Sequence, residues 1–127
     1  MTENIEWTDD QIVEYVIAAC VKQHEAGFRI ITGSWIGSDC MCPGMAAICA
    51  MHPDFSGFLY YKALGDLFNK NEPWSIGFIL GIDTGRASIV SNAELIASDE
   101  GRNISVRVRT RLLELCILEL DSEVDDW

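Results

Sequence analysis

The segment from Thr8 to Gly27 constrains the fold more than any other part of the sequence, because it carries a start and a stop signal for a helix. Thr8, with Gln11 three residues later, forms the capping-box pattern of a helix N-terminus. Gly27 can take the left-handed conformation that ends a helix. Between them, apolar residues recur every three or four positions, as on the buried face of an amphipathic helix. We predict a helix over residues 8–26.

The middle of the chain predicts further helices separated by loops. Pro43 suits the first position of a helix that runs to about Met51. Another helix is expected over about residues 57–69, and a third begins at Pro73. Residues 28–32 could form a short extended piece, and the glycines and serines that follow predict a loop.

The C-terminal third allows two interpretations. Ser91 and Glu94 form a second capping box ahead of a short helix. Residues 103–120 combine strand-like alternation with many helix-forming Leu, Glu and Arg residues, and we favour one long helix. The alternative is a β-hairpin in which residues 94–97 pair with residues 104–109.

These patterns predict a mainly α-helical fold, a compact single domain of about five or six helices that could include a short β-hairpin. The 127 residues suffice for one hydrophobic core. Residues 121–127 are expected to form an acidic tail. No apolar run approaches the ~20 residues of a membrane span, and the N-terminus lacks the apolar stretch of a signal peptide. We therefore expect a cytoplasmic protein.

The net charge of −11 lies wholly at the two ends of the chain. Residues 1–14 hold five acids, residues 114–127 hold six, and neither segment has a Lys or Arg. Such a protein should repel nucleic acid and anionic membranes and be attracted to a basic surface. The expected partner-binding residues are Glu3, Glu6, Asp9, Asp10, Glu14, Glu119, Asp121, Glu123, Asp125 and Asp126.

This charge pattern predicts a non-catalytic acidic protein that binds, and could inhibit, a basic partner protein. Phage anti-defence inhibitors, nucleic-acid mimics and immunity proteins work in this way, although no motif links the chain to them. The pattern predicts neither direct nucleic-acid binding nor membrane binding. The competing interpretation is that the acids serve solubility alone.

A second hypothesis rests on four potential metal ligands within 13 residues. Cys40 and Cys42 lie in the predicted loop, and Cys49 and His52 would share a helix face, so together they could close a tetrahedral zinc site. Cys42 also precedes Pro43 at a helix N-terminus, where the dipole could lower the thiol pKa and make it a nucleophile. The structural alternative is that these thiols pack as small apolar side chains.

Two further patterns allow both a functional and a structural interpretation. Asp83-Thr84-Gly85 is similar to the D-T-G loop of retroviral-type aspartic proteases and to a phosphate-binding turn of actin-like ATPases and sugar kinases. We favour a helix end, in which glycines at spacing four let another backbone approach closely. An arginine group could bind phosphate, but we favour ion pairs with the acids, for example Arg111 with Glu114 or with the Asp9/Asp10 turn. The arginines are Arg102, Arg107, Arg109 and Arg111.

A series of aromatic, cysteine and glycine residues resembles a group of short uncharacterised bacterial proteins. The matching residues are, in order, Trp35, Cys40-Met41-Cys42-Pro43, Leu64-Gly65 and Trp74-x-x-Gly77-Phe78-x-x-Gly81-x-Asp83. The likeness covers residues 28–111 loosely and departs from the group's pattern at Met41, Gly44 and Thr84. It implies a bacterial or phage origin and no activity.

Overall fold

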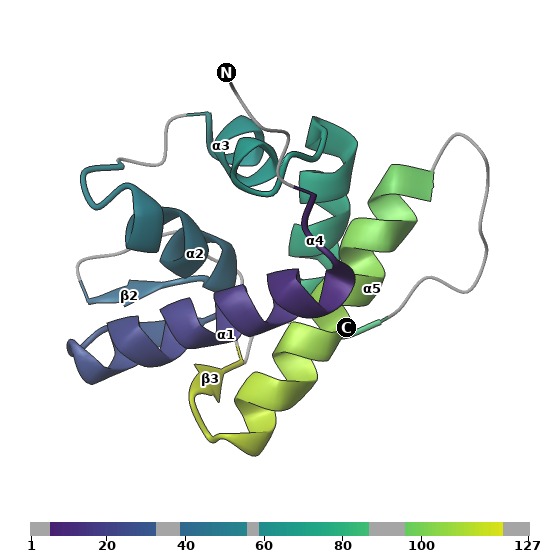
Figure 1. Ribbon diagram of the computed structural model, residues 1–127. Helices are drawn as coiled ribbons and strands as arrows, with labels where there is room; N and C mark the ends of the chain where they lie inside the picture. The colour runs from purple at the N-terminus through teal and green to yellow at the C-terminus, as the bar shows by residue number, and fades with distance from the viewer. Residues whose placement is uncertain (1–5, 33–38, 56–58, 87–95, 121–127) are drawn as a thin grey trace.

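The computed structural model describes residues 6–32, 39–55, 59–86 and 96–120, which hold five helices and three short strands (Figure 1). The helices are α1 (Asp9–Glu25), α2 (Pro43–Met51), α3 (Tyr60–Leu67), α4 (Glu72–Thr84) and α5 (Ile96–Glu114). The strands are β1 (Arg29–Ile31), β2 (Cys40–Met41) and β3 (Leu118–Glu119). The prediction of a mainly α-helical fold is confirmed.

Helix α1 begins and ends where its sequence signals predict. The Thr8 hydroxyl accepts from the Gln11 N–H at 3.1 Å, and the Thr8 N–H donates to the Gln11 side chain at 2.9 Å. Gly27 has a φ of +103°, and the Phe28 N–H donates to the Gln23 carbonyl at 3.0 Å. This 6→1 hydrogen bond and the left-handed glycine form the Schellman motif, which commonly ends a helix.

The strands form a small parallel sheet in the order β2-β1-β3. The extended piece expected over residues 28–32 contains β1, and its Ile30 is fully buried. Cys40 and Met41 were expected in a loop but form β2, which corrects that prediction. Strands of two or three residues are too short to show an alternating pattern, and their pairing is set by contacts distant in the sequence.

The described part of the C-terminal segment adopts the favoured single helix, so the alternative β-hairpin is wrong. Residues 96–114 run as α5 without interruption. Gly101, which was expected in the hairpin turn, lies inside this helix, where a Cβ would overlap the Trp74 carbonyl of α4. The helix also ends before residue 120, because Cys116 takes a left-handed φ of +59° and the Ile117 N–H donates to the Leu112 carbonyl.

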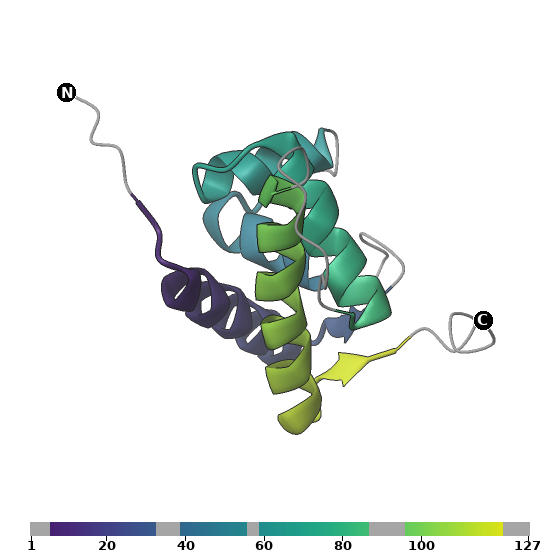
Figure 2. The ribbon, with the colours of Figure 1, turned by 90° about the vertical axis from the view of Figure 1, so that its right-hand side faces the viewer.

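Helices α4 and α5 pack with their backbones in close approach (Figure 2). A Cβ at Gly77 would overlap the Ser98 carbonyl, and one at Gly81 would overlap the Ser105 hydroxyl. Ordinary helix pairs stand 8–10 Å apart because of their side chains, and glycine removes that spacing. The close backbone approach predicted for the glycines at spacing four is confirmed for Gly77 and Gly81, whereas a Cβ at Gly85 would meet the Arg109 side chain.

The core lies where α1, α2, α4 and α5 meet and is filled by apolar side chains from all four helices. Its fully buried members include Ile12, Ile48, Phe78 and Val108. No helix in the described ranges combines the length and apolar character that a membrane span requires. The expected Ser91–Glu94 cap, the glycine loop over residues 33–38, Glu3 and the tail over residues 121–127 lie outside the described residues.

Candidate functional site

Four acids predicted to bind a partner gather at the N-terminal end of α1, and all are exposed. They are Glu6, Asp9, Asp10 and Glu14. Asp10 forms an ion pair with Arg107 of α5 at 2.5 Å. The other three make no ion pair with any residue that the structure describes. Three described carboxylates at this end of the molecule therefore face solvent without an ion-pair partner.

Glu119, the first of the predicted C-terminal acids, has a structural partner. Two nitrogens of the Arg29 guanidinium donate to its two carboxylate oxygens at 2.9 Å each, across the β1–β3 pair. The hydrogen bond from Arg29 holds the pKa of the Glu119 carboxyl below its ordinary value. Figure 2 shows β3 toward the C-terminal end of α1, and Arg29 follows that end by four residues. Since the 17 residues of α1 span roughly 25 Å, Glu119 does not join the acids at the N-terminal end.

The arginine group is used within the fold. Arg107 pairs with Asp10, and Arg111 lies 3.6 Å from Glu114, so the predicted ion pairing is confirmed for these two. The other two arginines donate to backbone carbonyls. One carbonyl is in the last turn of α4, where helix carbonyls lack internal partners, and the other lies two residues after that helix. These hydrogen bonds are from Arg102 to the Arg86 carbonyl at 2.7 Å and from Arg109 to the Ile82 carbonyl at 2.6 Å.

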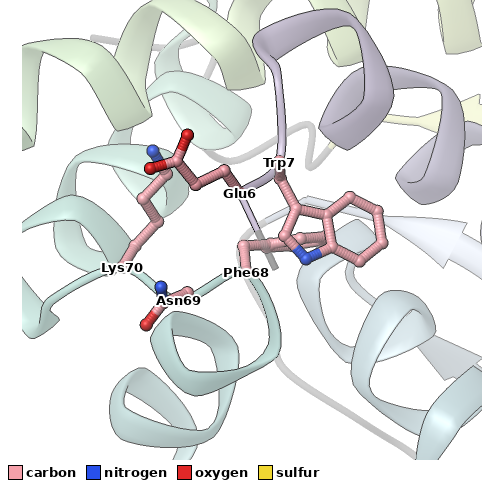
Figure 3. Close-up of a pocket in the computed structure, with 5 residues that line it drawn as sticks. All are labelled: Glu6, Trp7, Phe68, Asn69 and Lys70. Carbon is pink, nitrogen blue, oxygen red and sulfur yellow. The ribbon is translucent and has the colours of Figure 1, made fainter. Parts of the chain in front are cut away.

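A pocket of about 290 Å³ lies beside the acidic end of α1, between the chain before the helix and the segment after α3 (Figure 3). Its walls are Glu6, Trp7, Phe68, Asn69 and Lys70. The Trp7 ring makes an edge contact with the buried Phe68 ring at a centroid distance of 5.1 Å. The pocket thus joins an aromatic wall to one negative and one positive side chain.

The end of α3 fixes two of these walls. The Lys70 N–H donates to the Gly65 carbonyl at 2.8 Å, and the Asn69 N–H donates to the Asp66 carbonyl at 3.3 Å. Asn69 takes the left-handed φ of +56° that this helix-ending motif requires, and Asn tolerates it better than most residues. The sequence analysis did not predict this pocket, because its walls come from residues about 60 positions apart. The one signal available was Asn69 at a helix end.

Cys42 is buried at the N-cap of α2 and is not an activated thiol. Its sulfur accepts from the Met45 N–H at 3.4 Å and lies 3.1 Å from the Tyr60 hydroxyl. Burial raises the pKa of the Cys42 thiol to about 11, which outweighs the lowering by the hydrogen bonds from Tyr60, Met45 and Gly44. The suggestion of a lowered pKa at this helix N-terminus is therefore wrong, because the loss of hydration dominates.

The four predicted zinc ligands are not brought together. Cys40 lies half-buried on β2, Cys42 is in the core, Cys49 is half-buried on α2, and His52 is exposed at the C-cap of α2. In the parts of the chain that the structure describes, no three His, Cys, Asp or Glu side chains are placed to share one metal ion. Cys49 instead lines a small pocket of about 220 Å³ with Phe28 and other residues, and burial raises its pKa.

Asp83-Thr84-Gly85 forms the end of α4. The Thr84 hydroxyl donates to the Leu80 carbonyl at 2.7 Å, and Gly85 takes a left-handed φ of +70° as the C-cap. The predicted helix end is confirmed. Comparisons with family models, curated proteins and solved structures returned no match, so the proposals below rest on this chain alone.

Proposed function

We propose that the protein is a non-catalytic binding protein that recognises a basic surface on a partner protein. The binding surface is the acidic start of α1, which consists of Glu6, Asp9 and Glu14, together with Glu3 just before them. The observation that carries the proposal is that these three described carboxylates are exposed and have no ion-pair partner among the described residues, whereas Asp10, Glu114 and Glu119 each have one.

Stabilisation of α1 explains only part of the negative charge at its N-terminal end. Asp9 and Asp10 lie in the first turn of α1, where the helix dipole favours a negative charge. That effect fades within one turn, so it gives no stability to Glu14, and Glu6 precedes the helix. A cationic partner would reduce the electrostatic repulsion between these carboxylates. A partner is therefore the better explanation for their placement.

The chemistry of such an interface is electrostatic. Complementary charges at the rim of an interface mainly speed association, and salt slows it. The proposal includes inhibition of the partner, because an acidic surface placed over a basic site would exclude the anionic ligand that uses that site. The C-terminal acids Asp121, Glu123, Asp125 and Asp126 are proposed to add to this attraction.

The test begins with affinity purification of the tagged protein from the cells that encode it, and continues with the purified partner. The variant Glu6→Gln/Asp9→Asn/Glu14→Gln should bind at least about tenfold more weakly. The matched control is Glu25→Gln/Asp54→Asn/Glu100→Gln, which removes the same charge from exposed sites elsewhere on the described surface. If both variants weaken partner binding equally, the affinity depends on net charge alone, and a specific binding surface is refuted.

The thiol-based alternative gains no support from the described geometry. Cys42 is buried with a raised pKa, and Cys49 packs against apolar residues. No observation on the described residues favours zinc or thiol chemistry, so we do not propose it.

A further inference from the structure

The pocket beside α1 carries two opposite charges that are not joined in an ion pair. Figure 3 shows the Glu6 carboxylate and the Lys70 ammonium pointing toward one another across the same side of the pocket. They do not form an ion pair of 4.0 Å or less, although both residues are described. Both groups can therefore accept a ligand charge without first breaking a close ion pair.

The aromatic wall and the backbone of this pocket are held in place before any ligand binds. The Trp7 ring makes edge contacts with the Tyr15 and Phe68 rings at centroid distances of 5.4 Å and 5.1 Å. The backbone of Asn69 and Lys70 is fixed by the hydrogen bonds that end α3. A preformed site needs less ordering of side chains when a ligand binds, and this favours affinity.

We propose that this pocket binds a free zwitterion of the α-amino-acid type. The ammonium of the ligand lies at the Glu6 carboxylate, and its carboxylate lies at the Lys70 ammonium. The Asn69 amide offers a further hydrogen bond, and an apolar or aromatic side chain of the ligand packs against Trp7. This site goes beyond the proposed protein-binding surface, with which it shares only Glu6.

Charge and size both favour such a ligand. A singly charged ligand would satisfy one of Glu6 and Lys70 and meet repulsion from the other, whereas a zwitterion pairs with both. The volume of about 290 Å³ lies just below the ~300–1,000 Å³ that small-molecule sites usually occupy, which suits an amino acid better than a nucleotide.

The experiment is an NMR titration of the ¹⁵N-labelled full-length protein with L-phenylalanine, L-phenylalaninamide and N-acetyl-L-phenylalanine. The amide lacks the negative charge of the ligand, and the acetyl derivative lacks the positive one. We expect L-phenylalanine to shift the Trp7 indole N–H and Asn69 side-chain resonances, with at least about tenfold higher affinity than either derivative. Equal binding of the amide would show that the pocket is a cation site instead. If none of the three compounds shifts these resonances, the pocket does not bind such a ligand. Either result overturns the proposal.

Variants then separate this site from the protein-binding surface. Glu6→Gln and Lys70→Met should each abolish the preference for the zwitterion, and the exposed controls Glu14→Gln and Lys22→Gln should preserve it. Glu14→Gln should weaken partner binding without changing L-phenylalanine binding. Lys70→Met should weaken L-phenylalanine binding without weakening partner binding. Loss of the preference in the control variants would refute the assignment of the two charges.

Discussion

The Tyr60 hydroxyl lies 3.1 Å from the Cys42 sulfur inside the protein, where both side chains are buried. Gly44, the second residue of α2, makes this possible, because a Cβ at that position would overlap the Tyr60 hydroxyl. The contact joins the N-cap of α2 to the first turn of α3. A titratable pair thus sits in the core in its neutral form, and this has a measurable consequence.

Alkaline pH should destabilise the protein. Burial raises the pKa of Cys42 from 9.0 to about 11, and raises those of Tyr60 and Cys20 well above their ordinary values. The stability that the neutral thiol provides is fully present below pH 9 and is lost as the pH rises toward 11, because the unfolded chain releases its proton first. Cys42 alone should account for roughly 2–3 kcal/mol across this window.

Urea unfolding at pH 7, 9 and 10.5 under reducing conditions measures this loss. The matched variant is Cys42→Ser, which can keep both the helix cap and the hydrogen bond to Tyr60 but does not titrate in this range. The variant should lose less stability above pH 9 than the wild-type protein. An identical loss in the two proteins would show that Cys42 does not contribute to it.

Replacing Cys116 by glycine should stabilise the protein. Cys116 ends α5 with a left-handed φ of +59°, a conformation that disfavours any residue with a Cβ. Glycine removes that strain but adds freedom to the unfolded chain, which leaves a net gain of roughly 0.5–1 kcal/mol. Thermal unfolding of Cys116→Gly measures the gain. A lower melting temperature would contradict the observed end of α5.

Replacing Gly77 by alanine should strongly destabilise the contact between α4 and α5. The new Cβ would overlap the Ser98 carbonyl, and this part of the backbone cannot shift without moving α5. We expect a cost of about 1–3 kcal/mol even though alanine is the better helix former. The control is the exposed neighbour Ile76→Ala, which should change stability by less than about 0.5 kcal/mol. Equal effects of the two substitutions would refute the close helix contact.

The sequence predicted those features whose signals are local. The capping box at Thr8, the left-handed Gly27 and Pro43 at the start of α2 all appear where they were expected. The glycines of α4 were also interpreted correctly, because their spacing of four places them on one helix face. Such signals need no knowledge of the rest of the fold.

Features that depend on distant contacts were missed. The parallel sheet pairs β1 with β3, which lie about 90 residues apart. The end of α5 at Cys116 lacks the glycine that usually marks such an end, so the helix was expected to run to residue 120. The raised pKa of Cys42 comes from its burial in the folded core, and the pocket of Figure 3 depends on the contact between Trp7 and Phe68. A local sequence pattern does not show which distant residues come into contact.

The central claim is that the acidic start of α1 attracts a basic partner. The most direct measurement is the association rate constant with the purified partner at ionic strengths from 0.02 to 0.5 M (chosen because screening lengths fall from about 20 Å to about 4 Å over this range). We predict that the rate falls by at least about tenfold, and that Glu6→Gln/Asp9→Asn/Glu14→Gln removes most of this dependence while the control triple variant keeps it. A rate that does not change with salt, or a triple variant with the same salt dependence as the wild-type protein, would contradict the claim.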